Sequence, residues 1–175
     1  MNENESKGFE KLWAPWRMEY IEGIGAENSN QCIFCAKPGE KEDAKNYILH
    51  RGKSCFLVLN IFPYNNGHLL IIPFKHTSEF EELDKEIVAE LMELTNLAIK
   101  AIKKTMRPDG FNVGMNLGRS AGAGIAEHLH LHIVPRWNGD TNFMPVIGGT
   151  KVISESLDRT YEKLKKAIEE FLGEK

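Results

Sequence analysis

Long apolar runs are absent from this sequence, and so is the pattern of a secretion signal. The longest apolar stretches, such as LLIIPF at residues 69–74, are far too short to span a bilayer. The first residues, MNENESKGFEK, are polar and acidic, and they lack the charged-then-apolar order of a signal peptide. We therefore expect a cytoplasmic protein that has no membrane partner.

An excess of positive charge is also missing. The formal net charge is −3 at pH 7, so no basic surface indicates binding to nucleic acid or to a membrane. Net charge does not report how charges are distributed, so a cleft can still be locally positive and bind phosphate. We expect no nucleic-acid partner.

Cysteine is scarce, because the chain has 3 residues of this type, Cys32, Cys35 and Cys55. An odd count with one Cys-x-x-Cys pair argues against a disulfide scaffold. In a reducing compartment, Cys32 and Cys35 are better interpreted as metal ligands or as a redox pair.

The length of 175 residues suits one domain, so we expect a single domain over residues 1–175 with a flexible N-terminus at residues 1–11. Dense apolar segments predict strands, and apolar spacing of three and four residues predicts helices. The predicted strands are 54–61, 68–73, 111–117 and 128–134 (ended by Pro135), and the predicted helices are 78–106 and 156–172. Loops are expected at 22–46 and 118–124. This order predicts an α+β fold with an antiparallel sheet, a long helix after the first hairpin and a C-terminal helix.

Half of the 6 histidines lie in the stretch HLHLHIV, residues 128–134. Alternate side chains of a strand share a face, so His128, His130 and His132 should point to one side while the intervening apolar residues join the core. Chance, or three histidines satisfied within the core, is the plain alternative. Strict alternation next to a glycine-rich loop favours a site, because imidazole serves acid–base, nucleophilic and ligand roles.

Two kinds of site fit the triplet. One is a catalytic zinc with an open position for water, and the other is a neutral imidazole that attacks phosphorus. The loop GRSAGAG, residues 118–124, exposes backbone N–H groups that can wrap an anion. A phosphoryl or nucleotidyl transfer site needs such a cradle, whereas a zinc hydrolase does not. The loop therefore favours the nucleophilic histidine, although a flexible surface connection would have the same composition.

These segments resemble the histidine triad superfamily, whose signature is His-x-His-x-His followed by apolar residues. AGAGIAEHLHLHIVPR (121–136) is similar to that signature. LNIFPYNNGHLLIIPFKH (59–76) resembles the second marker of the family, a strand, a Pro-containing turn, Gly-His, a strand and Pro-x-x-His. The flanks LWAPWRMEYI (12–21) and RWNGDTNFMPVIGGTKVI (136–153) resemble the diadenosine tetraphosphate phosphorylase branch.

The resemblance implies nucleotidyl transfer through a covalent nucleotidyl-histidine. It assigns the role of nucleophile to His130 and the contact with the scissile phosphate to His132. It places His128 in the catalytic site beside His130. The implied ligands of the phosphate and leaving group are the side chain of Asn116 and the loop residues Gly122, Ala123 and Gly124.

The resemblance also implies a nucleoside pocket. The base of the bound nucleoside would contact Ile33, Phe34, Val58 and Ile61, although core packing explains the apolar character of these residues about as well. Many relatives have an acidic residue that binds the ribose at the position of Asn60. Asn can still accept one hydrogen bond while it donates another.

A second departure lies between the glycines and the triplet. Many hydrolases of the superfamily have a Gln and a Ser or Thr there, whereas this chain has Gly124 and Ile125. The missing side-chain donors argue against a simple monophosphoramidate hydrolase and fit a site that admits inorganic phosphate.

In zinc-bearing members of the superfamily, the ligands match Cys32, Cys35, His76 and His128. Two thiolates and two imidazoles would saturate zinc, so the metal would be structural. A reduced, metal-free Cys-x-x-Cys is the alternative.

We therefore expect an enzyme that cleaves dinucleoside polyphosphates, such as diadenosine tetraphosphate, with inorganic phosphate as the acceptor. A hydrolase of dinucleoside polyphosphates or nucleoside phosphoramidates, with water as the acceptor, is the first alternative. A non-catalytic nucleotide-binding protein is the second. Members of the family are usually homodimers, and Trp13 and Trp16 are candidates for that interface or for the second base, with plain packing as the alternative.

Overall fold

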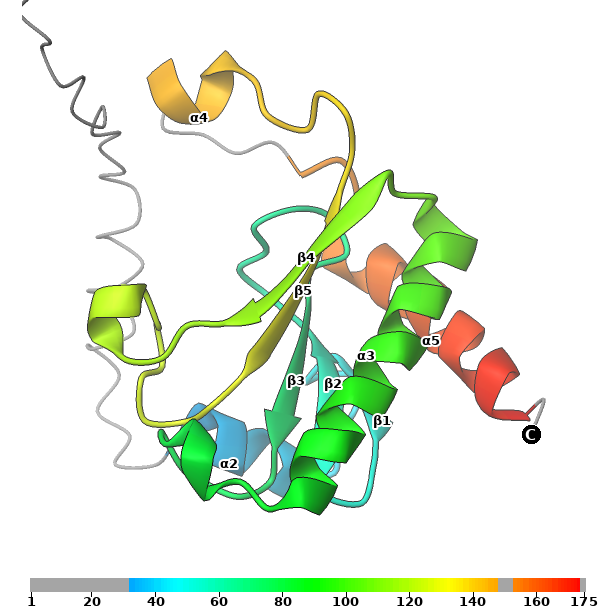
Figure 1. The fold of residues 1–175 in the computed structure, drawn as a ribbon. Coiled ribbons are helices and arrows are strands. Elements are labelled where there is room, and N and C mark those ends of the chain that lie inside the picture. Colours follow the sequence, from blue (N-terminus) through cyan, green and yellow to red (C-terminus); the bar gives the residue numbers. More distant parts are fainter. Residues whose placement is uncertain (1–31, 148–152, 174–175) are drawn as a thin grey trace, which may run out of the picture. The chain divides into compact units, whose positions relative to one another are not determined.

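The sheet is the centre of the computed structural model, which describes residues 32–147 and 153–173. Within these residues, five strands pair in the antiparallel order β1-β2-β3-β5-β4 (Figure 1). Their bounds are β1 Ile48–Arg51, β2 Cys55–Leu59, β3 Leu69–Pro73, β4 Gly110–Met115 and β5 Leu131–Arg136. The predicted α+β class with an antiparallel sheet is confirmed.

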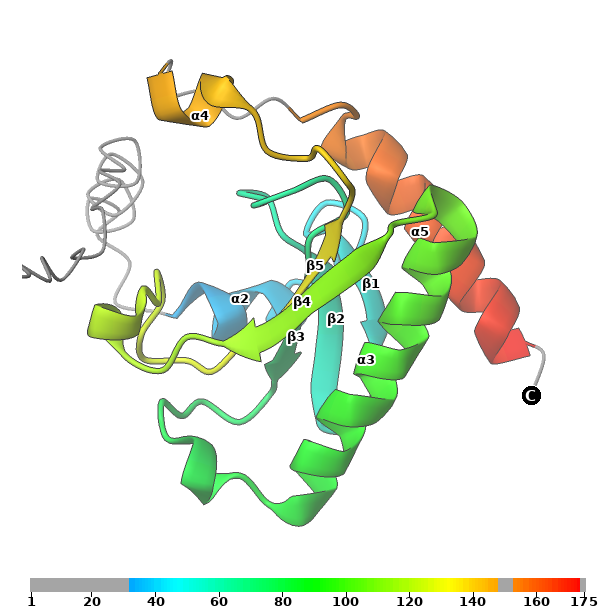
Figure 2. The same cartoon turned by 45° about the horizontal axis from the view of Figure 1, so that its top comes forward.

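Two long helices cover one face of this sheet, α3 (Lys85–Met106) and α5 (Leu157–Gly173) (Figures 1 and 2). Leu91 of α3 and Leu164 of α5 are fully buried against apolar side chains of the strands, such as Leu57 and Ile71. At its C-terminus, α3 ends where Arg107 adopts the left-handed conformation, with φ 50° and ψ 57°. The helix after the hairpin and the C-terminal helix are therefore both present as predicted.

The start of the long helix differs from the prediction of residue 78. A short 3-10 helix occupies Phe80–Glu82, and the backbone is extended at Leu83 and Asp84 before α3 begins at Lys85. Apolar spacing continues through Leu83 and does not reveal this break, because a 3-10 turn and an α-turn place side chains at similar intervals.

The opposite face of the sheet packs on a helix that the sequence did not predict, α2 (Ile33–Gly39). Phe34 of α2 belongs to an apolar cluster with Phe56, Val58, Leu70 and other residues of the strands. Because both faces are covered, all five residues of β2 and all five of β3 are buried. This double burial explains why the two strands are apolar without alternation.

The histidine-bearing strand also differs from its predicted range of 128–134. β5 begins at Leu131, where it first pairs with Ile71 of β3, and it continues through Pro135 to Arg136. Proline is tolerated because its carbonyl points away from β4 and accepts a hydrogen bond from the Asn65 amide, 3.1 Å away. The missing N–H therefore interrupts no bond between β5 and β4.

The chain divides into two compact units. Of the described residues, 32–140 and 153–173 form the unit that contains the sheet, and 141–147 belong to the other. In that second unit, α4 covers Phe143–Ile147. The single domain predicted for residues 1–175 stays a prediction. The flexible segment predicted at residues 1–11, and Trp13 and Trp16, lie outside the described residues.

None of the helices in the described ranges combines the length and the apolar character that crossing a membrane requires. The cytoplasmic location stays a prediction.

Candidate active site

The three histidines of HLHLHIV lie together on the face of the sheet that α2 covers. His132 stands on β5, opposite Leu70 of β3, and the rings of His130 and His132 have centroids 4.9 Å apart. Phe34 contacts both His128 and His130, with ring centroids 5.7 and 5.2 Å away. The predicted shared face therefore extends beyond the strand itself, because His128 and His130 precede β5 and still point to this side.

His130 has its proton fixed by the backbone. Its Nδ1 atom lies 2.8 Å from the carbonyl oxygen of His128. A carbonyl can only accept, so Nδ1 carries the proton, and the lone pair of the neutral ring is on Nε2. Burial lowers the pKa of His130, which favours this neutral form. The ring is thus prepared as a nucleophile at Nε2.

His132 has the opposite tautomer, and His68 of the neighbouring segment imposes it. The N–H of Tyr64 donates to Nδ1 of His68 over 3.0 Å, so the proton of neutral His68 must be on Nε2. Nε2 of His68 then donates to Nδ1 of His132, 2.9 Å away. The proton of neutral His132 is therefore on Nε2, where it can be donated to a phosphate oxygen.

Burial keeps His68 neutral. The side chain is fully buried, and this burial, followed by the nearby rings of His132 and His130, lowers the pKa of His68 to about 3. A neutral imidazole offers one donor and one acceptor, which is the pattern that the two contacts of His68 require.

The ring of His128 has different partners from the rings of His130 and His132. Its Nε2 lies 2.9 Å from the carbonyl oxygen of Pro73, so the proton is on Nε2 and Nδ1 has a free lone pair. That Nδ1 faces Cys32 Sγ at 3.3 Å, Cys35 Sγ at 3.5 Å and His76 Nδ1 at 3.2 Å. The ring of His128 thus belongs to a group of metal-binding atoms, although its carbonyl serves His130.

Cys32, Cys35, His76 and His128 form a group that could hold a metal ion, with their ligand atoms all within 4.8 Å of one another. Around a tetrahedral zinc ion, neighbouring nitrogen and sulfur ligands are separated by roughly 3.3–3.8 Å. The separations of 3.2–3.5 Å around Nδ1 of His128 are close to those values. Burial and the adjacent Cys32 raise the pKa of the Cys35 thiol, and a bound cation would favour the thiolate form of Cys35.

The glycine-rich loop between β4 and β5 closes on itself. Arg119–Ala121 form a 3-10 turn, and Gly118 and Gly122 have φ angles of 80° and 92° that suit glycine. The Ala123 N–H donates to the Gly118 carbonyl over 3.3 Å, and Asn116 donates to the carbonyl of Gly122 over 3.4 Å. Both bonds are long, so a stronger anionic acceptor would compete for these donors. The predicted phosphate contacts of Gly122, Ala123, Gly124 and Asn116 stay predictions.

The residues predicted to line a base pocket fall into two groups. Phe34 and Val58 are buried in the apolar cluster behind the histidines, as core packing would place them. Ile33 and Ile61 are 40% and 38% exposed, so their side chains are accessible to a ligand.

Tyr64 belongs to the site although the sequence indicated only a turn. Its ring stacks on His132, with centroids 5.5 Å apart and planes 11° from parallel, and it also approaches His68. The loop that carries Tyr64 is held by Asn65, whose amide donates to Pro135 and, over 2.8 Å, to Asp140. The dipeptide Tyr-Asn within a turn does not indicate that Tyr64 contacts His132. The contact depends on where β5 ends, since the end of β5 anchors the loop through Asn65.

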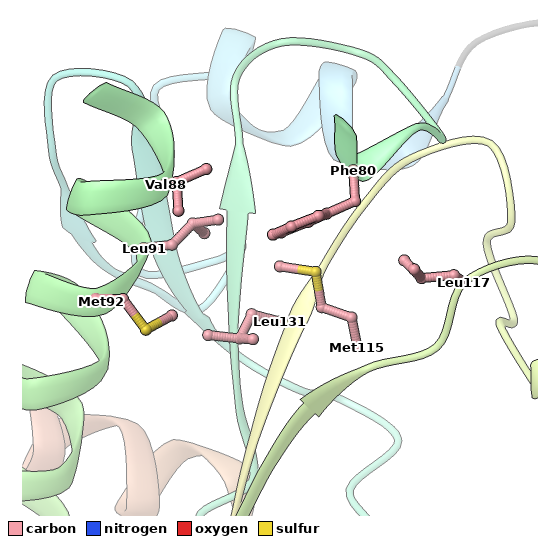
Figure 3. Close-up of a pocket in the computed structure, with 7 residues that line it drawn as sticks. All are labelled: Phe80, Val88, Leu91, Met92, Met115, Leu117 and Leu131. Carbon is pink, nitrogen blue, oxygen red and sulfur yellow. The ribbon is translucent and has the colours of Figure 1, made fainter. Parts of the chain in front are cut away.

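A concave feature lies on the other face of the sheet from the histidines. It is an apolar pocket of about 390 Å³ beside α3 and β4 (Figure 3). Its lining consists of Phe80, Val88, Leu91, Met92, Met115, Leu117 and Leu131. Because Leu131 and His132 are consecutive residues of β5 and point to opposite faces, this pocket is separate from the histidine site.

Comparison with known proteins agrees with this geometry. The family model described as "HIT domain" matches residues 40–139. A Mycobacterium tuberculosis (strain ATCC 25618 / H37Rv) protein named AP-4-A phosphorylase is 46% identical over 156 residues, which cover 86% of this chain and 80% of that protein. Adenylylsulfatase HINT3 of Arabidopsis thaliana is 34% identical over a region that covers 82% of this chain and 67% of that protein.

Two solved structures extend the comparison. A Zn-bound histidine triad family protein from Mycobacterium smegmatis has a TM-score of 0.67 at 26% identity, covering 83% of this chain and 98% of its own. A histidine triad nucleotide-binding protein from Sulfolobus tokodaii has a TM-score of 0.62 at 32% identity, covering 82% of this chain and 93% of its own.

Proposed function

Since this chain belongs to the HIT domain family, we propose that it is a nucleotidyl transferase that cleaves dinucleoside polyphosphates by phosphorolysis. The name of its Mycobacterium tuberculosis relative supports diadenosine tetraphosphate as the substrate type. The observation that carries the proposal is the pair of opposite tautomers, a lone pair on Nε2 of His130 beside a proton on Nε2 of His132.

The first step forms a covalent intermediate. The Nε2 lone pair of His130 attacks the α-phosphorus, and the bond from that phosphorus to the bridging oxygen breaks. Diadenosine tetraphosphate thus leaves an adenylyl group on His130 and releases ATP. His132 donates its Nε2–H to a phosphate oxygen, and Asn116 and the loop amides of Ala123 and Gly124 stabilise the charge that develops there.

In the second step, an oxygen of inorganic phosphate attacks the adenylyl phosphorus. The bond from phosphorus to Nε2 breaks, ADP is released, and the lone pair returns to His130. Gly124 and Ile125, at positions where many hydrolases of the superfamily have side-chain donors, add none here, which supports a phosphate ion as the acceptor.

Product analysis tests the proposal. Diadenosine tetraphosphate is incubated with the protein with and without phosphate, and the nucleotides are separated by chromatography. We expect ADP and ATP only when phosphate is present. AMP and ATP in equal amounts regardless of phosphate would establish the alternative, a hydrolase with water as the acceptor. Absence of any product and of a nucleotidyl-protein adduct would leave the non-catalytic nucleotide-binding alternative.

We further propose that Cys32, Cys35, His76 and His128 bind a structural zinc ion. The support is the donor set, the convergence of the ligand atoms within 4.8 Å of one another, and a Zn-bound structure among the similar proteins. Two thiolates and two imidazoles saturate the ion, so these residues hold α2 to the segment before β5 and supply no open coordination position for chemistry.

The homodimer implied by the family is proposed to form at β4. In the described part of the chain, β4 pairs only with β5, so its other edge offers backbone donors and acceptors to a second strand. Two copies of one edge strand can pair about a two-fold axis in the antiparallel sense. Met92 and Leu117 at the nearby pocket (Figure 3) are 47% and 50% exposed, and Val113 of β4 is 45% exposed. A second copy would cover these side chains.

A further inference from the structure

Asn60, at the end of β2, has both ends of its amide engaged within the protein. The N–H of Phe62 donates to Oδ1 of Asn60 over 3.0 Å. This backbone donor identifies the oxygen, so the NH2 group is the end that faces Nδ1 of His68 at 3.2 Å. Asn60 therefore donates to His68.

Two donors meet at this one atom of His68. Nδ1 accepts from the Asn60 amide at 3.2 Å and from the Tyr64 N–H at 3.0 Å. An N–H group can donate to Nδ1 only if Nδ1 keeps its lone pair. Each of the two donors therefore disfavours a proton on Nδ1. Together they hold the proton of His68 on Nε2, which faces Nδ1 of His132.

We infer that Asn60 is a positioning residue for the phosphate end of the site: its bond to Nδ1 holds the ring of His68, whose tautomer the Tyr64 N–H also fixes, in the orientation that donates to His132. The role of His132 in this inference rests on the proposed function. The resemblance to the family implies a contact with ribose at this position, where many relatives have an acidic residue. A carboxylate has no proton to donate, so it could not make the bond to His68 that Asn60 makes.

The charges near His68 allow one clear substitution test. The ionisable side chains against its ring are His132 and Tyr64, with His130 close by, and none of them is a carboxylate. Asn60→Asp keeps the size of the side chain and places a carboxylate about 3 Å from Nδ1. We expect the full negative charge of this carboxylate to outweigh the Tyr64 N–H and draw a proton onto Nδ1, whereas Asn60→Ala should leave Nδ1 unprotonated because the Tyr64 N–H then acts alone.

Nitrogen-15 NMR of the histidine rings measures this directly in the full-length protein. In the wild type and in Asn60→Ala, Nδ1 of His68 should give the signal of an unprotonated nitrogen, and in Asn60→Asp that of a protonated one. An unprotonated Nδ1 in the Asp variant, or a protonated Nδ1 in the wild type, would overturn the inference. Asn66→Ala is the matched control, because Asn66 lies in the same turn and bonds Thr160 instead.

Kinetics separates positioning from ribose binding. Diadenosine tetraphosphate is compared with its bis(2′-deoxyadenosine) counterpart in the wild type and in Asn60→Ala. We expect Asn60→Ala to lower kcat about tenfold, the equivalent of one hydrogen bond, and to leave the ratio of the two KM values unchanged. If the variant loses the preference for the ribose substrate while kcat is preserved, Asn60 binds the sugar and the inference is wrong.

The two proposals fail in different ways. A wild-type protein that forms no ADP from diadenosine tetraphosphate and phosphate contradicts the proposed function, and the NMR signals of His68 still decide the inference about Asn60. A wild type that does form ADP, with ring signals that do not respond to Asn60→Asp, contradicts the inference alone.

Discussion

The carbonyl oxygen of His128 lies 2.8 Å from Nδ1 of His130, so the backbone of one histidine fixes the proton of the next. The same residue directs Nδ1 of its ring to Cys32. The backbone of His128 therefore belongs to the proposed chemistry, while its side chain belongs to the group that could bind a metal ion.

Replacement of His130 tests the covalent step. His130→Ala removes the Nε2 lone pair, so we expect kcat to fall on the order of a thousandfold or more while the nucleotide still binds. Turnover is measured with phosphate present, and binding is measured by calorimetry. Intact-mass spectrometry should detect a nucleotidyl adduct on the wild type and none on the variant. His50→Ala is the control, since His50 lies on β1 outside the site, and near-native turnover by His130→Ala would exclude the mechanism.

Metal analysis tests the zinc site. Purified protein should contain about one zinc per chain, and Cys35→Ser should contain almost none, because three ligands hold zinc more weakly than four. We expect the variant to melt at least about 5 °C lower, since bound zinc stabilises only the folded state. Cys55→Ala is the control, because Cys55 is buried on β2 away from the other cysteines. Zinc retained in full by Cys35→Ser would contradict the assignment.

The low pKa of His68 predicts how stability depends on pH. Its folded pKa of about 3 is below the ordinary value of 6.5, so the unfolded chain binds the proton more readily. The stability due to neutral His68 is therefore complete above pH 6.5 and is lost as the pH falls toward 3. Between pH 7 and pH 5, this loss amounts to about 2 kcal/mol in the free energy of unfolding.

Urea unfolding at the two pH values checks this prediction. His68→Gln offers an amide oxygen and an amide NH2 in place of the two ring nitrogens, and it does not titrate. The variant should lose about 2 kcal/mol less than the wild type over this interval. Other histidines with lowered pKa, such as His130, contribute to both proteins and cancel in the difference. Equal losses in the two proteins would mean that His68 is not held neutral.

The proposed dimer depends on the open edge of β4. Val113→Lys places a charge in the middle of that strand, where it opposes pairing with a second copy. Light scattering after size-exclusion chromatography should give a dimer for the wild type and a monomer for the variant. Glu93→Lys introduces the same side chain at an exposed position of α3 and serves as the control. A wild type that is monomeric at all concentrations would contradict the dimer.

The sequence predicted the elements whose patterns are local. The spacing of apolar residues located α3 and α5, and the unbroken apolar segments located β2 and β3. Strand boundaries depend on partners that are distant in the chain, so they were less well predicted. β5 begins at Leu131 because β3 pairs with it from that residue, and Leu129 bonds the Thr77 carbonyl instead. β1 has only four residues and a bulge between Ile48 and His50, which leaves no periodic signal.

The candidate site was predicted in part for the same reason. Cys32, Cys35, His76 and His128 do meet, although they come from three separate segments, and their convergence was implied by the family resemblance. The contact of His68 with His132 depends on the register of β3 against β5, which no local pattern specifies. The roles of the individual site residues in binding and catalysis stay predictions.

The backbone carbonyl and the ring of His128 have separate roles, and this separation affects which substitutions the site can accept during evolution. Every amino acid has a backbone carbonyl, so the proton of His130 would stay on Nδ1 whichever side chain followed Glu127. Only the proposed zinc site requires imidazole at position 128. A lineage that dispensed with the metal could therefore replace the first histidine of the triplet and keep the proposed nucleophile intact, whereas the proposed roles of the second and third histidines allow no such replacement.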